Sequence, residues 1–191
     1  QSVVIAGKSD PAGHFALPDP HDILRYLVRN PEREAMALAL LATYGFAGTA
    51  GNGLSHIIGL REVKNFLAAG MPALKRKGWK VEFQGKVAEL ADTLEHVVPV
   101  VRVSQPQGER WFDIGFEYAD VHGRSLSVVE VQRALLKGDN FIVKGGRTLL
   151  LDPEAIRDMN EIFADCASRD GSQPGLFRLN DLHAAYVYSS L

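Results

Sequence analysis

The chain has 191 residues, a formal net charge of -2 and an apolar fraction of 46%. This length suits one domain, or two small ones that share a core, and the ordinary charged fraction of 23% excludes a disordered or collagen-like chain. The balance of 21 basic and 23 acidic residues excludes a generally basic nucleic-acid binder, although a local basic patch remains open.

Features missing from the sequence narrow the class of protein further. It has no apolar run of about 18 residues, so we expect no membrane span. Cys166 is the single cysteine, which excludes an internal disulfide or a thiolate metal site and fits a reducing compartment. Because the chain begins at Gln1, without Met or a basic and apolar leader, we expect a piece of a longer protein or a processed product.

The N-terminal part predicts one strand and two helices. Val3–Ile5 is β-branched and is followed by repeated glycine and proline breaks. A helix is predicted to begin near Asp22, because four apolar residues fall on one stripe: Ile23, Leu24, Leu27 and Val28. A second helix is predicted from Pro31 to Tyr44, with Asn30 as its N-cap and Gly45 at its end. Its nearly all-apolar body favours burial on several sides.

The next segment predicts a loop, a long helix and a strand. Residues 48–53 are rich in glycine, and apolar residues then recur at helical spacing: Val63, Phe66, Leu67, Met71 and Leu74. We expect Pro72 to kink or split this helix and Gly78 to cap its end. Trp79, Val81 and Phe83 alternate with polar residues, which predicts a half-buried strand.

The C-terminal part predicts strands mixed with helices. Strands are predicted over 97–104 and 111–118, followed by a turn at His122-Gly123. Ser127 and Glu130 form a capping box at the start of a helix. A hairpin is predicted over 141–151, followed by a helix from Asp152 that points Ile156, Met159 and Phe163 inward. The last predicted element is a helical stretch over 179–188.

This order of elements predicts an α+β fold, in which a helical N-terminal half packs on a mainly antiparallel sheet with interspersed helices. We expect a single domain over 1–191. Its natural subdivision is a helical sub-lobe 1–78 and a strand-rich sub-lobe 79–191.

The residue patterns that often carry chemistry are weak in this chain. Gly7-Lys8-Ser9 lacks the first glycine of a phosphate-binding loop, so a turn is favoured there. Gly145-Gly146 precedes a strand rather than a helix, which favours a tight turn over a phosphate cradle. Asp113 and Glu117 stand about 13 Å apart along a strand, too far for one metal ion. We therefore expect no catalytic residue, metal or cofactor within this chain.

One segment has an unusual charge. Between Arg61 and Lys86, seven basic residues face two acidic ones, a local net charge of +5, and Trp79 lies among them. Such a segment favours non-specific contact with nucleic-acid phosphates, for which the best candidates are Lys75, Arg76, Lys77 and Lys80. The plainer interpretation is a solvated helix end, where the helix dipole favours lysine.

The order of several short motifs is familiar. A Phe66-x4-Met71-Pro72-x-Leu74 helix precedes Gly78-Trp79, and Trp111-Phe112-Asp113 opens a strand. After this strand come a glycine turn, a helix, the hairpin around Gly145-Gly146-Arg147, and the segment from Leu149 to Pro153. From about Arg33 to Phe163 the chain resembles the bacterial Swi/Snf-type helicase-associated region. Trp111-Phe112-Asp113 is the sharpest of these motifs. The family often has Leu-x-Asp-Gly where this chain has Lys144-Gly145-Gly146.

The resemblance implies an accessory role in a DNA-dependent ATPase. In that family the region lies just before the motor in the same polypeptide, and ATP and Mg²⁺ belong to the motor. The implied partners are the chain's own C-terminal motor and double-stranded DNA, with no membrane, in a cytoplasmic, nucleoid-associated protein. Trp79, Trp111, Phe112 and Asp113 are then structural; we expect Trp111 and Phe112 near the core and Asp113 capping a turn or accepting backbone N–H groups.

Two other classes of function stay open. The chain could be a protein-docking module without DNA contact, which an exposed apolar patch would favour. A small-molecule-binding domain or enzyme would instead need a deep pocket with converging polar groups.

Overall fold

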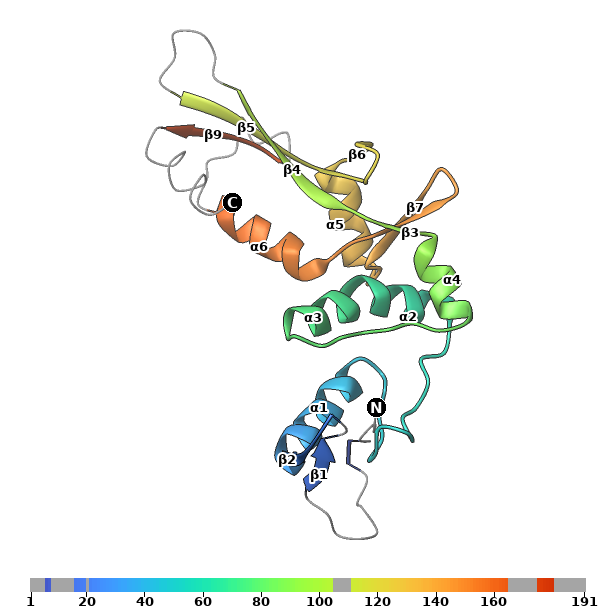
Figure 1. The fold of residues 1–191 in the computed structure, drawn as a ribbon. Helices are drawn as coiled ribbons and strands as arrows, with labels where there is room; N and C mark the ends of the chain where they lie inside the picture. Colours follow the sequence, from blue (N-terminus) through green and yellow to red (C-terminus); the bar gives the residue numbers. More distant parts are fainter. Residues whose placement is uncertain (1–5, 8–15, 20, 105–110, 165–174, 181–191) are drawn as a thin grey trace. The chain divides into compact units, whose positions relative to one another are not determined.

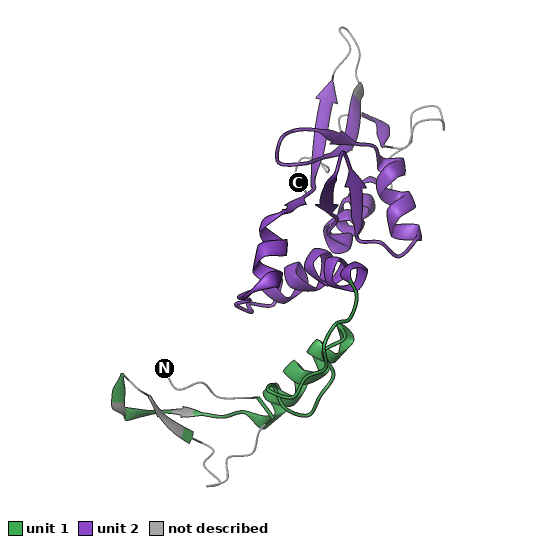
Figure 2. Ribbon diagram, turned by 90° about the vertical axis from the view of Figure 1, so that its right-hand side faces the viewer, with its two compact units in different colours: residues 1–59 green, residues 60–191 purple. Residues whose placement is uncertain are grey.

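The computed structural model describes residues 6–7, 16–19, 21–104, 111–164 and 175–180 (Figure 1). The chain has an α+β fold with mainly antiparallel sheets, as the sequence predicts. It divides into two compact units, residues 1–59 and 60–191 (Figure 2), so the boundary falls well before the sub-lobe boundary at 78/79. The strand predicted at Val3–Ile5, the Gly7-Lys8-Ser9 turn beyond Gly7, and Cys166 lie outside the described residues.

The first unit contains a β-hairpin where a helix was predicted. β1 (Ala16–Asp19) pairs antiparallel with β2 (Asp22–Val28), and Ala16 lies opposite Val28. The prediction of a helix from Asp22 was wrong, because an apolar stripe in so short a segment fits either structure. Tyr26 and Val28 are residue types that favour a strand. The pairing of this segment with β1 decides for a strand, and the apolar pattern of the segment alone does not show that pairing.

The helix of the first unit is α1 (Pro31–Thr43), with the caps that the sequence predicts. The Asn30 side chain accepts a hydrogen bond from the backbone N–H of Arg33 at 3.0 Å, and Gly45 follows the helix with φ of 91°. Arg29 and the backbone N–H of Gly7 both donate to Glu34 and lower its pKa to about 2. The prediction that this helix is buried on several sides was wrong, because Leu38 is its buried residue.

The second unit begins with one continuous helical segment. It runs through α2 (Leu60–Asn65), a π-helical turn (Phe66–Gly70) and α3 (Met71–Arg76). Pro72 has no N–H, so it cannot donate the usual bond to the preceding turn, and the wider π turn lies directly before it. The predicted split at Pro72 is absent, because helical backbone continues from Leu60 to Arg76, and the predicted kink stays a prediction.

The end of α3 has the cap that the sequence predicts. Gly78 has φ of 81°; its N–H donates to Lys75 O at 2.9 Å, and the N–H of Trp79 donates to Leu74 O at 3.1 Å. This pair of bonds is the Schellman motif, which requires a left-handed residue at the position of Gly78. It ends the helix at a defined point and fixes the direction of the following segment.

The strand predicted over Trp79–Phe83 is absent. Trp79, Val81 and Phe83 are half-buried and alternate with exposed residues, but no strand in the described part of the chain pairs with them. The alternation of apolar and polar residues therefore predicted the burial of these side chains correctly, but it wrongly predicted that their backbone pairs with another strand. Phe83 instead packs against the small cluster of Leu67, Ala68 and Leu150. α4 (Lys86–Asp92) follows.

Two sheets form the rest of the second unit. In the smaller one, β8 (Arg147–Leu150) lies between β3 (Leu94–His96), which is parallel to it, and β7 (Phe141–Lys144), which is antiparallel. In the larger one, β5 (Trp111–Ala119) pairs antiparallel with β4 (Val98–Ser104), β6 (Ser125–Leu126) and β9 (Leu176–Asn180). The predicted strands and hairpin are confirmed. The final helix is wrong where it overlaps β9, and residues 181–188 lie outside the described part.

The main core lies between the larger sheet and two helices, α5 (Val128–Leu136) and α6 (Pro153–Ala164) (Figure 1). Ile114, Phe116 and Tyr118 point into it from β5, and burial raises the pKa of Tyr118 to about 12. Phe163 of α6 stacks between Phe116 and Phe177, with ring centroids 5.6 and 4.9 Å away. The capping box of Ser127 and Glu130 starts α5 as predicted.

Replacing Phe163 by Ala is expected to lower the free energy of unfolding by about 3–5 kcal/mol, because the change leaves a cavity between two stacked rings. Chemical denaturation of the variant measures this. Leu136→Ala is the control, since Leu136 is 89% exposed and should change stability by less than about 0.5 kcal/mol. Equal effects of the two substitutions would contradict the placement of α6.

Candidate nucleic-acid interface

The basic residues proposed from sequence gather at the C-terminal end of α3. Lys75 lies in its last turn, Lys77 is its C-cap residue, and both are exposed. Lys80 is exposed in the segment that follows and forms an ion pair with Glu82 at 2.8 Å. Lys75 and Lys77 form no ion pair within the described part of the chain. Two ammonium groups are thus available to an anion at one fixed point of the fold.

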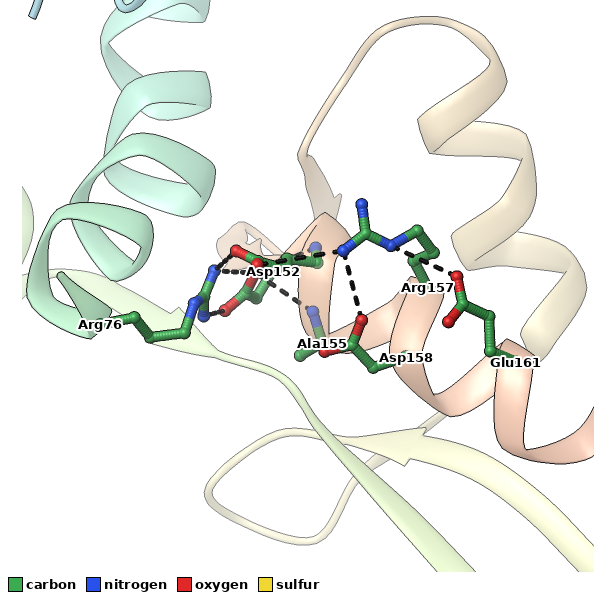
Figure 3. Close-up of polar contacts among 7 residues, drawn as sticks. Arg76, Asp152, Ala155, Arg157, Asp158 and Glu161 are labelled. Carbon is green, nitrogen blue, oxygen red and sulfur yellow. Dashed lines mark hydrogen bonds and ion pairs between the residues drawn. The ribbon is translucent and has the colours of Figure 1, made fainter. Parts of the chain in front are cut away.

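Arg76 has a different role from its neighbours. Its guanidinium binds Asp152 at 2.5 Å and also Glu154, both at the start of α6 (Figure 3). These hydrogen bonds, with Asp152 as the main partner, raise the pKa of Arg76. That Arg76 contacts phosphate stays a prediction; in the structure two carboxylates hold its guanidinium, and it connects the end of α3 to α6.

Asp152 makes this connection rigid. Its side chain accepts hydrogen bonds from the backbone N–H groups of Glu154 at 3.1 Å and Ala155 at 3.4 Å, and its carbonyl accepts from Ile156. It therefore caps α6 and binds Arg76 with the same carboxylate. Sequence reasoning recognised Asp152 as the start of a helix but missed its partner, because nothing in the sequence indicates which of several cations reaches it.

The other end of the helical segment is also tied to the smaller sheet. Arg61 binds Asp139 at 2.6 Å and the carbonyl of Lys137 at 2.8 Å. Lys64 donates to the Thr148 hydroxyl at 3.0 Å and lies over the ring of Phe141. Carboxylates distant in sequence thus pair with two of these cations, Arg61 and Arg76, and the exposed remainder includes Lys75 and Lys77.

His96 lies close to this remainder, at the end of β3. Partial burial lowers its pKa, and the charge of Lys75 lowers it further, although Asp152 acts in the opposite direction. A neutral imidazole adds no positive charge to this surface, so His96 does not strengthen its attraction for anions.

The family-motif residues occupy the larger sheet and the segment after α3. Asp113 is buried in the middle of β5, so it does not cap a turn; its Oδ1 accepts from Arg178 Nε of β9 at 3.0 Å. The backbones of Trp111 and Phe112 pair with Asn180 and Leu179, and their side chains lie outside the described part. Trp79 is half-buried.

Two negative findings concern the described residues alone. They contain no group of three or more His, Cys, Asp or Glu side chains that could hold a metal ion. Asp113 and Glu117 instead face arginines, with Arg102 at 2.6 Å from Glu117. No helix among them is long and apolar enough to cross a membrane.

Compared with protein-family models, with curated proteins and with solved structures, the chain gives no match. The resemblance to the Swi/Snf-type helicase-associated region therefore rests on the sequence motifs alone.

Replacing Arg76 by Met is expected to lower the free energy of unfolding by about 1 kcal/mol, because the contact is bidentate but partly exposed. Thermal or urea unfolding measures the change. The control is Arg157→Met, since Arg157 contacts only residues of its own helix among those described and should cost less than about 0.5 kcal/mol. If Arg76→Met is as stable as the native chain, the contact with α6 does not hold α3.

Proposed function

We propose that the chain is a non-catalytic accessory module of a bacterial Swi/Snf-type DNA translocase, and that its second unit contacts the phosphates of double-stranded DNA. The observation that supports the contact is the pair of exposed lysines at the capped end of α3, Lys75 and Lys77. Lys80 adds a third cation in the following segment. ATP and Mg²⁺ act in the motor, and this chain supplies no catalytic residue.

The local structure suits contact with a backbone rather than with bases. The Schellman motif and the Arg76 contact hold the lysines at one end of a rigid helix. Lysine is a compact, flexible charge, which binds phosphate without selecting a sequence. The interaction would position the motor on DNA, in a cytoplasmic, nucleoid-associated protein whose other partner is its own motor.

A second function is favoured by an observation in the first unit. Leu24, Tyr26 and Val28 alternate along β2, so they lie on one face of the hairpin, and all three are strongly exposed. Met36 of α1 is exposed too. An exposed apolar face of this kind marks a protein-docking surface, so this unit could serve as a docking module whether or not the second unit binds DNA.

DNA binding is tested by titrating the chain against a short duplex at two salt concentrations. We expect binding that weakens with salt, because each lysine–phosphate contact releases condensed counterions. The Lys75→Gln and Lys77→Gln double variant is expected to weaken binding and to reduce the slope of log K against log salt by about 1.8.

The matched control is the Arg133→Gln and Lys137→Gln double variant. Arg133 and Lys137 occupy the last turn and C-cap of α5, as Lys75 and Lys77 do in α3, and the variant removes the same charge. The control should bind DNA nearly as the native chain does. Equal losses in both variants would indicate attraction by net charge alone, and no binding at low salt would refute the DNA contact and leave the docking function.

A further inference from the structure

A small pocket lies between two turns of the second unit, away from the α3 lysines. One turn joins β5 to β6 at residues 120–125, and the other is the tip of the β7–β8 hairpin at 144–147. The pocket has a volume of about 130 Å³, far above the roughly 10–15 Å³ that one water requires. Its lining includes Arg124, Lys144, Gly145 and Arg147, together with Leu126 and Leu149. We call it the tip pocket.

Three cations from different parts of the chain converge on the tip pocket. The side chains of Arg124, Lys144 and Arg147 are 53%, 50% and 46% exposed. Their carboxylate partners lie deeper: the side chains of Asp120, Glu130 and Glu95 are 2%, 39% and 17% exposed. Each cation is therefore more exposed to solvent than the carboxylate that pairs with it.

The ion pairs leave hydrogen-bond donors unused. Arg147 gives one N–H to Glu95 at 2.7 Å, and Lys144 gives one to Glu130 at 2.8 Å. Arg124 gives its Nε–H to Asp120 at 2.7 Å and reaches Glu95 at 3.5 Å. A guanidinium has five donors and an ammonium three, so most of the donors remain available after these contacts. The carboxylates thus hold the cations in place rather than saturating them.

The turns that carry these residues are well fixed. Asp120 accepts hydrogen bonds from the backbone N–H groups of His122 at 2.9 Å and Arg124 at 3.0 Å. Burial favours a higher pKa for Asp120, but these bonds and the Arg124 side chain outweigh it and keep the pKa below its usual value. Gly145 and Gly146 have φ of 59° and 76°, as a two-residue hairpin turn requires, and open space surrounds them.

We propose that the tip pocket binds a phosphate group, held by Arg124, Lys144 and Arg147 beside the glycine turn. The three cations and three carboxylates balance formally, so the pocket does not attract anions from a distance. It selects instead by short charge-assisted hydrogen bonds, which suit a tetrahedral oxyanion with several acceptor oxygens. Ser125 is not a ligand, because its hydroxyl already donates to Glu117.

The phosphate has two sources, the DNA backbone or a small phosphate-bearing molecule, and one experiment separates them. The first arm titrates the full isotopically labelled chain with inorganic phosphate at constant ionic strength and follows the amide signals of Arg124, Gly145 and Gly146. We expect saturable shifts at these residues that the Lys144→Gln and Arg147→Gln double variant weakens at least about tenfold.

Two further variants serve as controls. Arg133→Gln with Lys137→Gln removes the same charge from α5 and should leave the phosphate shifts unchanged. Lys144→Arg with Arg147→Lys keeps both charges and should restore most of the binding. Phosphate shifts that do not saturate, or that persist in the Lys144→Gln and Arg147→Gln variant, overturn the proposal.

The second arm titrates the same variants with duplex DNA. If the Lys144→Gln and Arg147→Gln variant loses affinity for DNA as well as for phosphate, the pocket takes a backbone phosphate. If it loses phosphate binding alone, the ligand is a small phosphate-bearing molecule. This outcome is independent of the α3 lysines: absence of DNA binding by the native chain refutes the proposed DNA contact, whereas absence of phosphate binding refutes the tip pocket.

Discussion

The second unit depends on one strand, β5, which must pair on both edges while one of its faces lines the core. β4 pairs with it along one edge, and β6 and β9 share the other. Its inward residues Ile114, Phe116 and Tyr118 form the centre of the apolar cluster that α5 and α6 cover. Segments far apart in sequence are thus brought together by a single strand, and the β5–β6 turn of the tip pocket takes its position from it.

The helical segment over 60–76 is attached by a small apolar contact together with polar contacts at both of its ends. Leu67 and Ala68 pack against Leu150, a smaller apolar contact than the main core. Polar contacts therefore complete the attachment, with Arg61 and Asp139 at one end and Arg76 and Asp152 at the other. Lys75 and Lys77, on either side of Arg76 in sequence, are exposed.

Local signals in the sequence predicted local structure well. The Ser127 capping box, the Gly78 cap and the glycine hairpin all depend on residues within a few positions of each other. Features that depend on distant partners were missed: β2 and β9 exist because β1 and β5 pair with them, and no strand of the described residues pairs with the segment after Gly78. The same distinction holds for the candidate site. The exposure of Lys75 was predictable from sequence, but the ion pair between Arg76 and Asp152 was not.

The proposed DNA contact is tested most directly by the reactivity of individual lysines towards acetylation, with and without duplex DNA, read by mass spectrometry. We expect DNA to slow modification of Lys75 and Lys77 while Lys137 reacts at an unchanged rate. Equal protection of all exposed lysines, or none at Lys75 and Lys77 under conditions where DNA is bound, would contradict it.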